Sequence, residues 1–125
     1  MFGGITKSAI ELDCDATIES YNNALNGFRV EDSSVNMFTV NPATVPVLKS
    51  YGNIGGGLVV DNNSVATIRG ASIHGNTLDG EQRNVIVKFG SRGDFEGNTI
   101  EGDVIHCDYL IGNYLRGDYW FCKRM

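Results

Sequence analysis

The sequence predicts an all-β fold, and within that class a short parallel β-helix, a β-solenoid of stacked coils. Short runs rich in β-branched and aromatic residues alternate with Gly and Asn, as expected for short strands joined by tight turns. No window keeps the i, i+3, i+4, i+7 apolar spacing of an amphipathic helix. A six-residue unit recurs along the chain, which is typical of repeat architectures.

The recurring unit reads Gly-Asn-x-(Leu/Ile)-x-Gly. It occurs at 75–80, 97–102 and 112–117, with a looser copy at 22–27 and a degenerate one at 52–56. We expect the Asn to occupy a corner and to bond to the Asn of the next coil. The Leu or Ile then points inward, the next residue points outward, and the closing Gly allows the next bend.

The asparagines of these copies are unevenly spaced, with intervals of 30, 23, 22 and 15 residues. A period near 22 fits one coil, and loops of different length account for the rest. The length of 125 residues favours a single β-helical domain over 1–125. Its regular repeats are expected over about 52–120, after strands and a loop in 1–51.

A second periodicity leaves an alternative open. Apolar residues recur every five positions at Phe95, Ile100, Ile105, Leu110, Leu115 and Trp120. This spacing resembles pentapeptide-repeat proteins, which form a four-sided β-helix, and implies a scaffold that binds a protein partner. In that family small residues face inward two places earlier. Those places here hold polar residues that are costly to bury, namely Asn98, Asp103, Asp108, Asn113 and Asp118.

The stretch from about Gly52 to Tyr119 resembles the right-handed parallel β-helix of the pectate-lyase-like superfamily, in particular phage tailspikes. The likeness is carried by Gly97-Asn98-Thr99-Ile100-Glu101-Gly102 and its two sister copies. It implies a homotrimer that binds, and often cleaves, bacterial surface polysaccharide. It also implies the distal, C-terminal portion of a virion protein, made in the host cytoplasm without a signal peptide.

The leading functional hypothesis is therefore a tailspike or tail-fibre module for recognition of host surface polysaccharide and for trimer assembly. Whether the chain is also an enzyme, a glycoside hydrolase or polysaccharide lyase, is left open. If the copies of the unit stack, Asp79 and Glu101 form a carboxylate pair with Arg116 one coil further on. Paired carboxylates are the catalytic groups of glycosidases. The alternative to a catalytic pair is an ordinary solvent-exposed charged surface without a function.

Further candidate binding residues come from neighbouring positions. His74 and Glu96 precede the Gly-Asn pairs and are expected to line a nearby stripe. Tyr114, Tyr119 and Trp120 belong to an aromatic cluster near the C-terminus. Such rings stack on sugars, but they also serve as a cap on the last coil or as a trimer contact.

The remaining features argue against several classes of protein. A net charge of −5 argues against nucleic acid, and no apolar run is long enough for membrane insertion. No motif indicates a cofactor. Cys14, Cys107 and Cys122 lack the spacing of a zinc site, and we expect buried reduced thiols; His106 has no suitable ligand partners, so no metal is expected.

Overall fold

The computed structural model describes residues 4–6, 9–13, 17–38, 46–108, 113–119 and 122–125. Every regular element in these ranges is a β-strand, which confirms the predicted all-β class. The described residues form no helix that is long and apolar enough to cross a membrane.

In the described part of the chain, three sheets contain all of the strands except those of one hairpin, and every pairing within these sheets is parallel. Sheet A consists of β1 (Gly4–Thr6), β4 (Phe28–Glu31), β7 (Leu58–Asp61), β12 (Val85–Val87), β15 (Ile105–Cys107) and β17 (Lys123–Arg124). Sheet B consists of β16 (Tyr114–Gly117), β13 (Arg92–Glu96), β8 (Val65–Arg69), β5 (Ser34–Phe38) and β2 (Ala9–Asp13). Sheet C consists of β14 (Thr99–Ile100), β9 (Ser72–His74), β6 (Leu48–Tyr51) and β3 (Ile18–Tyr21). The hairpin is β10 (Thr77–Leu78) and β11 (Glu81–Gln82).

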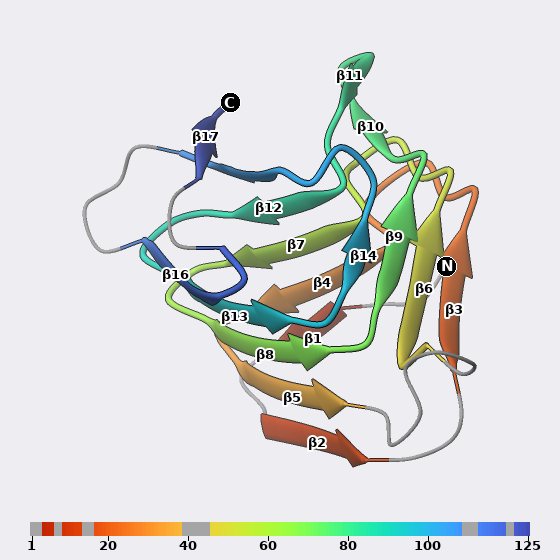
Figure 1. Cartoon of the computed structure of the whole chain (residues 1–125). Coiled ribbons are helices and arrows are strands. Elements are labelled where there is room, and N and C mark those ends of the chain that lie inside the picture. The colour runs from red at the N-terminus through yellow and green to blue at the C-terminus, as the bar shows by residue number, and fades with distance from the viewer. Residues whose placement is uncertain (1–3, 7–8, 14–16, 39–45, 109–112, 120–121) are drawn as a thin grey trace.

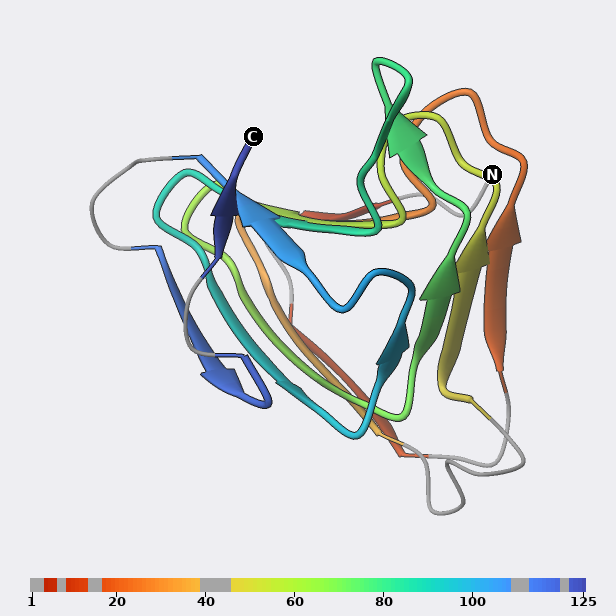
Figure 2. The same ribbon diagram turned by 45° about the horizontal axis from the view of Figure 1, so that its top comes forward.

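The chain visits sheets A, B and C in rotation, and one such round is called a passage: β1, β2 and β3 are followed by β4, β5 and β6, and so on to β16 with the hairpin inserted after β9. The next described strand, β17, lies on sheet A. Each passage lies beside the previous one, and the three sheets surround a common interior (Figure 1 and Figure 2). This order is compatible with the predicted β-helix. The pairing begins at Gly4, so the parallel ladder extends further toward the N-terminus than the range 52–120 expected for the regular repeats.

Apolar side chains from all three sheets fill the interior. On sheet A, Phe28, Leu58, Val85 and Ile105 lie opposite one another on successive strands and are buried. Each side chain of this kind contributes about 1.5–3 kcal/mol when fully buried. Apolar side chains at equivalent positions of successive passages therefore pack on one another, and no passage has to form a core of its own.

A ladder of asparagines joins the passages at the corner between sheets C and A. The Nδ2 of Asn23 donates to Oδ1 of Asn53 (2.8 Å), Asn53 to Asn76 (2.8 Å) and Asn76 to Asn84 (3.0 Å). Each accepting Oδ1 also takes the backbone N–H of the preceding rung, at 3.0–3.1 Å. The predicted Asn-to-Asn bonding is confirmed here, and Asn84 joins it although it stands outside the repeated unit.

Two later asparagines of the unit occupy the other corners. Oδ1 of Asn98 accepts the backbone N–H of Ala71 (2.8 Å) between sheets B and C. Oδ1 of Asn113 accepts the N–H groups of Gly90 and Ser91 (2.6 and 3.1 Å) between sheets A and B. One residue type thus satisfies backbone donors at all three corners.

The close copies of the six-residue unit consequently do not stack in one column, and that part of the prediction is wrong. Ile100 pairs with Ile73 rather than with Leu78, and Leu115 pairs with Gly93. Because the same short motif serves different corners, its recurrence gives no register. The uneven intervals between the asparagines follow from this.

The five-residue step has a related explanation. Phe95, Ile100, Ile105 and Leu115 are all buried in the core, on β13, β14, β15 and β16 in turn. These four strands belong to sheets B, C, A and B. A step of five leads from sheet B to C and from C to A, and a step of ten, from Ile105 to Leu115, leads from A to B. The described part of the chain has three parallel sheets, not the four sides expected for a pentapeptide repeat.

The expectation that every Leu or Ile of the unit points inward is also corrected. Leu25 is 61% exposed, and Leu78 is only half-buried. Leu25 lies in the connection between β3 and β4, and Leu78 lies on the hairpin, so neither stands on a strand of the three sheets. Ile100 and Leu115, which do stand on such strands, are buried.

The cysteines differ from the expected reduced thiols. Cys107 and Cys122 form a disulfide with their Cα atoms 5.8 Å apart, while Cys14 lies outside the described residues. The bond closes a loop with a sequence separation of 15. In the chain-entropy description, a disulfide that closes a loop of this length restricts the unfolded chain and stabilises the folded state by about 3 kcal/mol. The disulfide therefore ties the C-terminal segment to β15.

We predict that Asn53→Ala lowers the free energy of unfolding by about 2–4 kcal/mol, since it leaves several buried backbone and amide groups unpaired. Asn53 is 0% exposed and lies in the middle of the ladder. Urea denaturation followed by circular dichroism measures the change. Asn36→Ala, at a half-buried position on the outward side of β5, serves as the control and should change stability by less than about 0.5 kcal/mol. Equal losses in the two variants would contradict the role of the ladder.

Candidate functional site

The outward face of sheet B carries polar, charged and aromatic side chains in register. On β8, Ala66 and Ile68 are buried while Val65, Thr67 and Arg69 point away from the core. The same alternation on β13 places three outward residues beside them, namely Arg92, Asp94 and Glu96. The period of two along each strand thus separates the core from this face.

The two flanking strands extend the face in both directions. Asn36 and Phe38 of β5 lie beside β8, and Tyr114 and Arg116 of β16 lie beside β13. Neighbouring strands are about 4.8 Å apart, so the four strands present closely spaced rows of side chains. The face runs across the passages of the chain and not along one of them.

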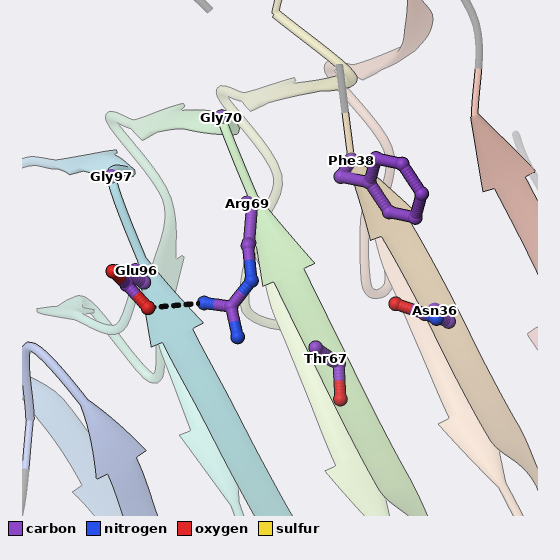
Figure 3. A pocket seen from close by; sticks show the side chains of 7 residues that line it. All are labelled: Asn36, Phe38, Thr67, Arg69, Gly70, Glu96 and Gly97. Atoms are coloured by element: carbon purple, nitrogen blue, oxygen red, sulfur yellow. Dashed lines mark hydrogen bonds and ion pairs between the residues drawn. The ribbon is translucent and has the colours of Figure 1, made fainter. Parts of the chain in front are cut away.

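A pocket of about 610 Å³ opens on this face. Its lining residues come from β5, β8 and β13 and the turns that follow β8 and β13: Asn36, Phe38, Thr67, Arg69, Gly70, Glu96 and Gly97. Figure 3 shows the Phe38 ring on one side of the pocket and the Arg69 and Glu96 side chains on the other. Aromatic, hydroxyl, amide and charged groups therefore surround one space.

Arg69 organises the charges in this pocket. Its guanidinium lies 2.7 Å from Glu96 and 3.5 Å from Asp94. The three side chains are 39%, 60% and 32% exposed, so water screens the pairs and each contributes little to stability. Their donors and acceptors face solvent and are accessible to a ligand.

A second pocket of about 150 Å³ adjoins the first, and Thr67 lines both. Tyr114 lies in it close to two cations: the Arg92 guanidinium is 4.8 Å from the ring centroid, and that of Arg116 is 5.6 Å away. Asp94 lines the same pocket. The two pockets together form the candidate site.

The structure brings together three of the residues predicted from the sequence, Glu96, Tyr114 and Arg116. Sequence reasoning missed Arg69 and Asp94, although a signal for both was present. The alternation in Val-Ala-Thr-Ile-Arg and Arg-Gly-Asp-Phe-Glu marks their outward positions. Aligning the two strand sequences with each other, instead of the Gly-Asn turns, gives the correct register.

His74 lies elsewhere, on sheet C. Its ring stacks on Tyr51 at 5.2 Å, and Tyr51 stacks on Tyr21 at 5.2 Å, which forms an exposed aromatic row. The Tyr51 hydroxyl donates to Glu19 (2.6 Å), and this bond raises the pKa of Tyr51 to about 12. His74 is therefore part of a ring stack on a different sheet from Glu96.

Asp79 and Glu101 are not stacked as predicted. Asp79 lies at the tip of the β10–β11 hairpin with φ of 53°, a conformation suited to a two-residue hairpin turn. Glu101 directly follows β14, and its carboxylate accepts the N–H of Gly75 (3.0 Å) and the amide of Gln82 (2.9 Å). These bonds lower the pKa of Glu101, the one from the Gly75 N–H most. Glu101 holds the hairpin.

The predicted aromatic residues near the C-terminus divide into different environments. Tyr119 packs half-buried against the core, and its hydroxyl donates to Asp103 (2.6 Å). Burial, and then this bond, raise the pKa of Tyr119. Tyr119 thus packs against the core, while Trp120 lies outside the described residues.

His106 is buried on sheet A, in a row with Val59 and Ile86 that is separate from the main core. Its Nε2 lies 3.4 Å from Arg83, while Nδ1 is buried and has no hydrogen-bond partner among the described residues. Burial, and then the charges of Arg83 and Lys123, lower the pKa of His106. The described residues include no group of three His, Cys, Asp or Glu side chains able to hold a metal.

Comparisons with known proteins give no match: no family model, no curated protein and no solved structure is similar to this chain.

We predict that stability falls as the pH drops below about 6.5, the ordinary pKa of an unfolded-state His. The folded-state pKa of His106 is lower, so the unfolded chain takes up the proton first and unfolding becomes more favourable. Urea denaturation between pH 7.5 and 5.5 measures this slope. His106→Leu should flatten it, whereas the control His74→Gln should retain it. Identical slopes for His106→Leu and the parent would refute the assignment.

Proposed function

We propose that this chain is a right-handed parallel β-helix whose outward sheet B face binds a polysaccharide of the bacterial surface. In this proposal the protein is a module of a phage tailspike or tail fibre. The rotation of the chain through three parallel sheets supports the β-helix. The observation that carries the function is the row of accessible polar and aromatic side chains around the two adjoining pockets.

The chemistry of the face suits a sugar polymer. Thr67, Asn36 and the Arg69–Glu96 pair offer donors and acceptors for hydroxyl groups. Phe38 and Tyr114 supply rings, whose faces pack against the C–H groups of a pyranose. A volume of about 610 Å³ falls in the range of sites that hold small ligands, so it accommodates a short segment of a chain.

An extended polymer also matches the geometry of the site. The lining residues come from four neighbouring strands, β5, β8, β13 and β16. A ligand that contacts all of them must lie across the strands. A polysaccharide does this with successive sugar units, whereas the net charge of −5 disfavours a nucleic acid.

We expect loss of side chains from the pockets to weaken polysaccharide binding. Arg69→Ala should reduce affinity about tenfold or more, because hydrogen bonds to charged groups contribute about 1.5–3 kcal/mol. Tyr114→Ala should reduce it about twofold to tenfold, because ring contacts contribute about 0.5–1.5 kcal/mol. A panel of capsular and O-antigen polysaccharides identifies the ligand, and isothermal titration calorimetry compares the variants.

Lys49→Ala serves as the matched control, since Lys49 lies over Tyr51 on sheet C. It should leave affinity unchanged. The release of reducing ends from the bound polymer tests the open question of cleavage in the same panel. If the parent binds no polysaccharide, the proposed function is wrong.

We further propose that the module assembles as a homotrimer, through an apolar stripe formed by Tyr21, Leu25 and Ile54. These side chains are 52%, 61% and 59% exposed. They lie on or next to connections that touch, since the N–H of Gly55 donates to the carbonyl of Leu25 (3.2 Å). Adjacent exposed apolar side chains mark interaction surfaces.

Light scattering coupled to size exclusion should give three times the mass of the chain. Leu25→Ser with Ile54→Ser should reduce the mass to that of one chain, because the contact loses its apolar side chains. Val65→Ser, at a position 38% exposed on sheet B, is the control and should remain trimeric. A parent that is a stable monomer would rule out the trimer.

A further inference from the structure

The charges of the candidate site are unevenly distributed between its two pockets. Arg69 pairs with both Asp94 and Glu96. Arg92 and Arg116 lie at the other end and form no ion pair within the described part of the chain. Three guanidinium groups and two carboxylates give this site a net charge of +1, although the whole chain carries −5.

The two unpaired guanidinium groups share one anchor. Arg92 lies directly beside Tyr114 on the neighbouring strand, and Arg116 lies two residues further along β16. Both lie over the Tyr114 ring, at 4.8 and 5.6 Å from its centroid. Stacking on a ring leaves the N–H groups at the edge of a guanidinium available. The Tyr114 ring therefore orients both guanidinium groups, and neither forms an ion pair with a carboxylate of the described residues.

We propose that the smaller pocket binds the carboxylate of an acidic sugar unit, held by Arg92 and Arg116. This rests on the proposed function and names the class of polysaccharide: one that carries uronic acid or a similar acidic sugar. The planar guanidinium matches a carboxylate in a bidentate geometry. The volume of about 150 Å³ suits one substituent, while the adjoining pocket of about 610 Å³ takes the neighbouring sugars.

The position of the acidic group follows from the same arrangement. Glu96 lines only the larger pocket, where it pairs with Arg69. Asp94 lines the smaller pocket, opposite Arg116 on the neighbouring strand, but Arg69 lies 3.5 Å from its carboxylate and offsets that charge. Two guanidinium groups, those of Arg92 and Arg116, thus remain in the smaller pocket for an anion. Arg116 and Tyr114 lie on β16, the strand on the far side of β13 from β8. The acidic unit thus binds at the β16 end, and uncharged sugars lie across β8 and β5.

The test compares polymers that differ only in their charge. Bacterial polysaccharides containing glucuronic acid are measured by calorimetry in their native form and after reduction of the carboxyl groups to alcohols. Neutral polysaccharides complete the panel. We expect the native acidic polymers to bind, and reduction to weaken binding on the order of tenfold to a hundredfold. Binding of the native form should also weaken as salt is raised.

Variants assign the effect to the two arginines. Arg92→Gln with Arg116→Gln should bind the native and the reduced polymer with equal, weak affinity. Lys49→Gln on sheet C also removes a positive charge and should keep the preference for the native form. Circular dichroism and urea denaturation of each variant verify that the fold is retained.

The outcomes separate this inference from the proposed function. Binding of neutral and carboxyl-reduced polymers as tight as that of native ones would overturn the acidic-sugar assignment and leave polysaccharide binding intact. The absence of any polysaccharide binding would overturn both. Tighter binding of single-stranded oligothymidylate than of any polysaccharide would assign the arginines to phosphate groups instead.

Discussion

The asparagine ladder between sheets C and A is the interaction on which the rest of the structure depends. Each strand pairs with strands of the neighbouring passages, and the chain must turn sharply before it reaches the next sheet. At this corner the backbone donors face the interior, where water does not reach them. Asn53, Asn76 and Asn84 are at most 1% exposed, and each satisfies the donor of the rung before it. The ladder thereby fixes the stacking of successive passages, and sheet register follows from it.

Glycines complete the same corner for a steric reason. A Cβ on Gly27 would overlap Ser50 and Asn53, and one on Gly57 would overlap Asn76. The corner therefore requires a side chain that bonds at one position and the absence of a side chain at another. Phe28 and Leu58, which begin the next strands, are placed in the core as a result.

The sequence predicted the class of fold because strand-forming runs and turn residues are local signals. It did not predict the register, since Asn98 and Asn113 look like Asn76 in sequence but serve other corners. The candidate site was predicted only in part, because its residues come together through the strand register. Glu96, Tyr114 and Arg116 were identified, while Arg69 was not, because its position depends on pairing between β8 and β13. The pairing of Asp79 with Glu101 assumed a register that does not occur.

The β10–β11 hairpin shows what the ladder permits. Asn76 and Asn84 are successive rungs, yet the hairpin lies between them in the chain and projects beyond the sheets (Figure 1). The corner therefore closes regardless of what the chain does between two rungs. Lengthening a loop costs little closure entropy once its ends are fixed. This site is accordingly a natural point for grafting: foreign peptides or recognition loops inserted there would be displayed on a scaffold that already bridges the gap beneath them.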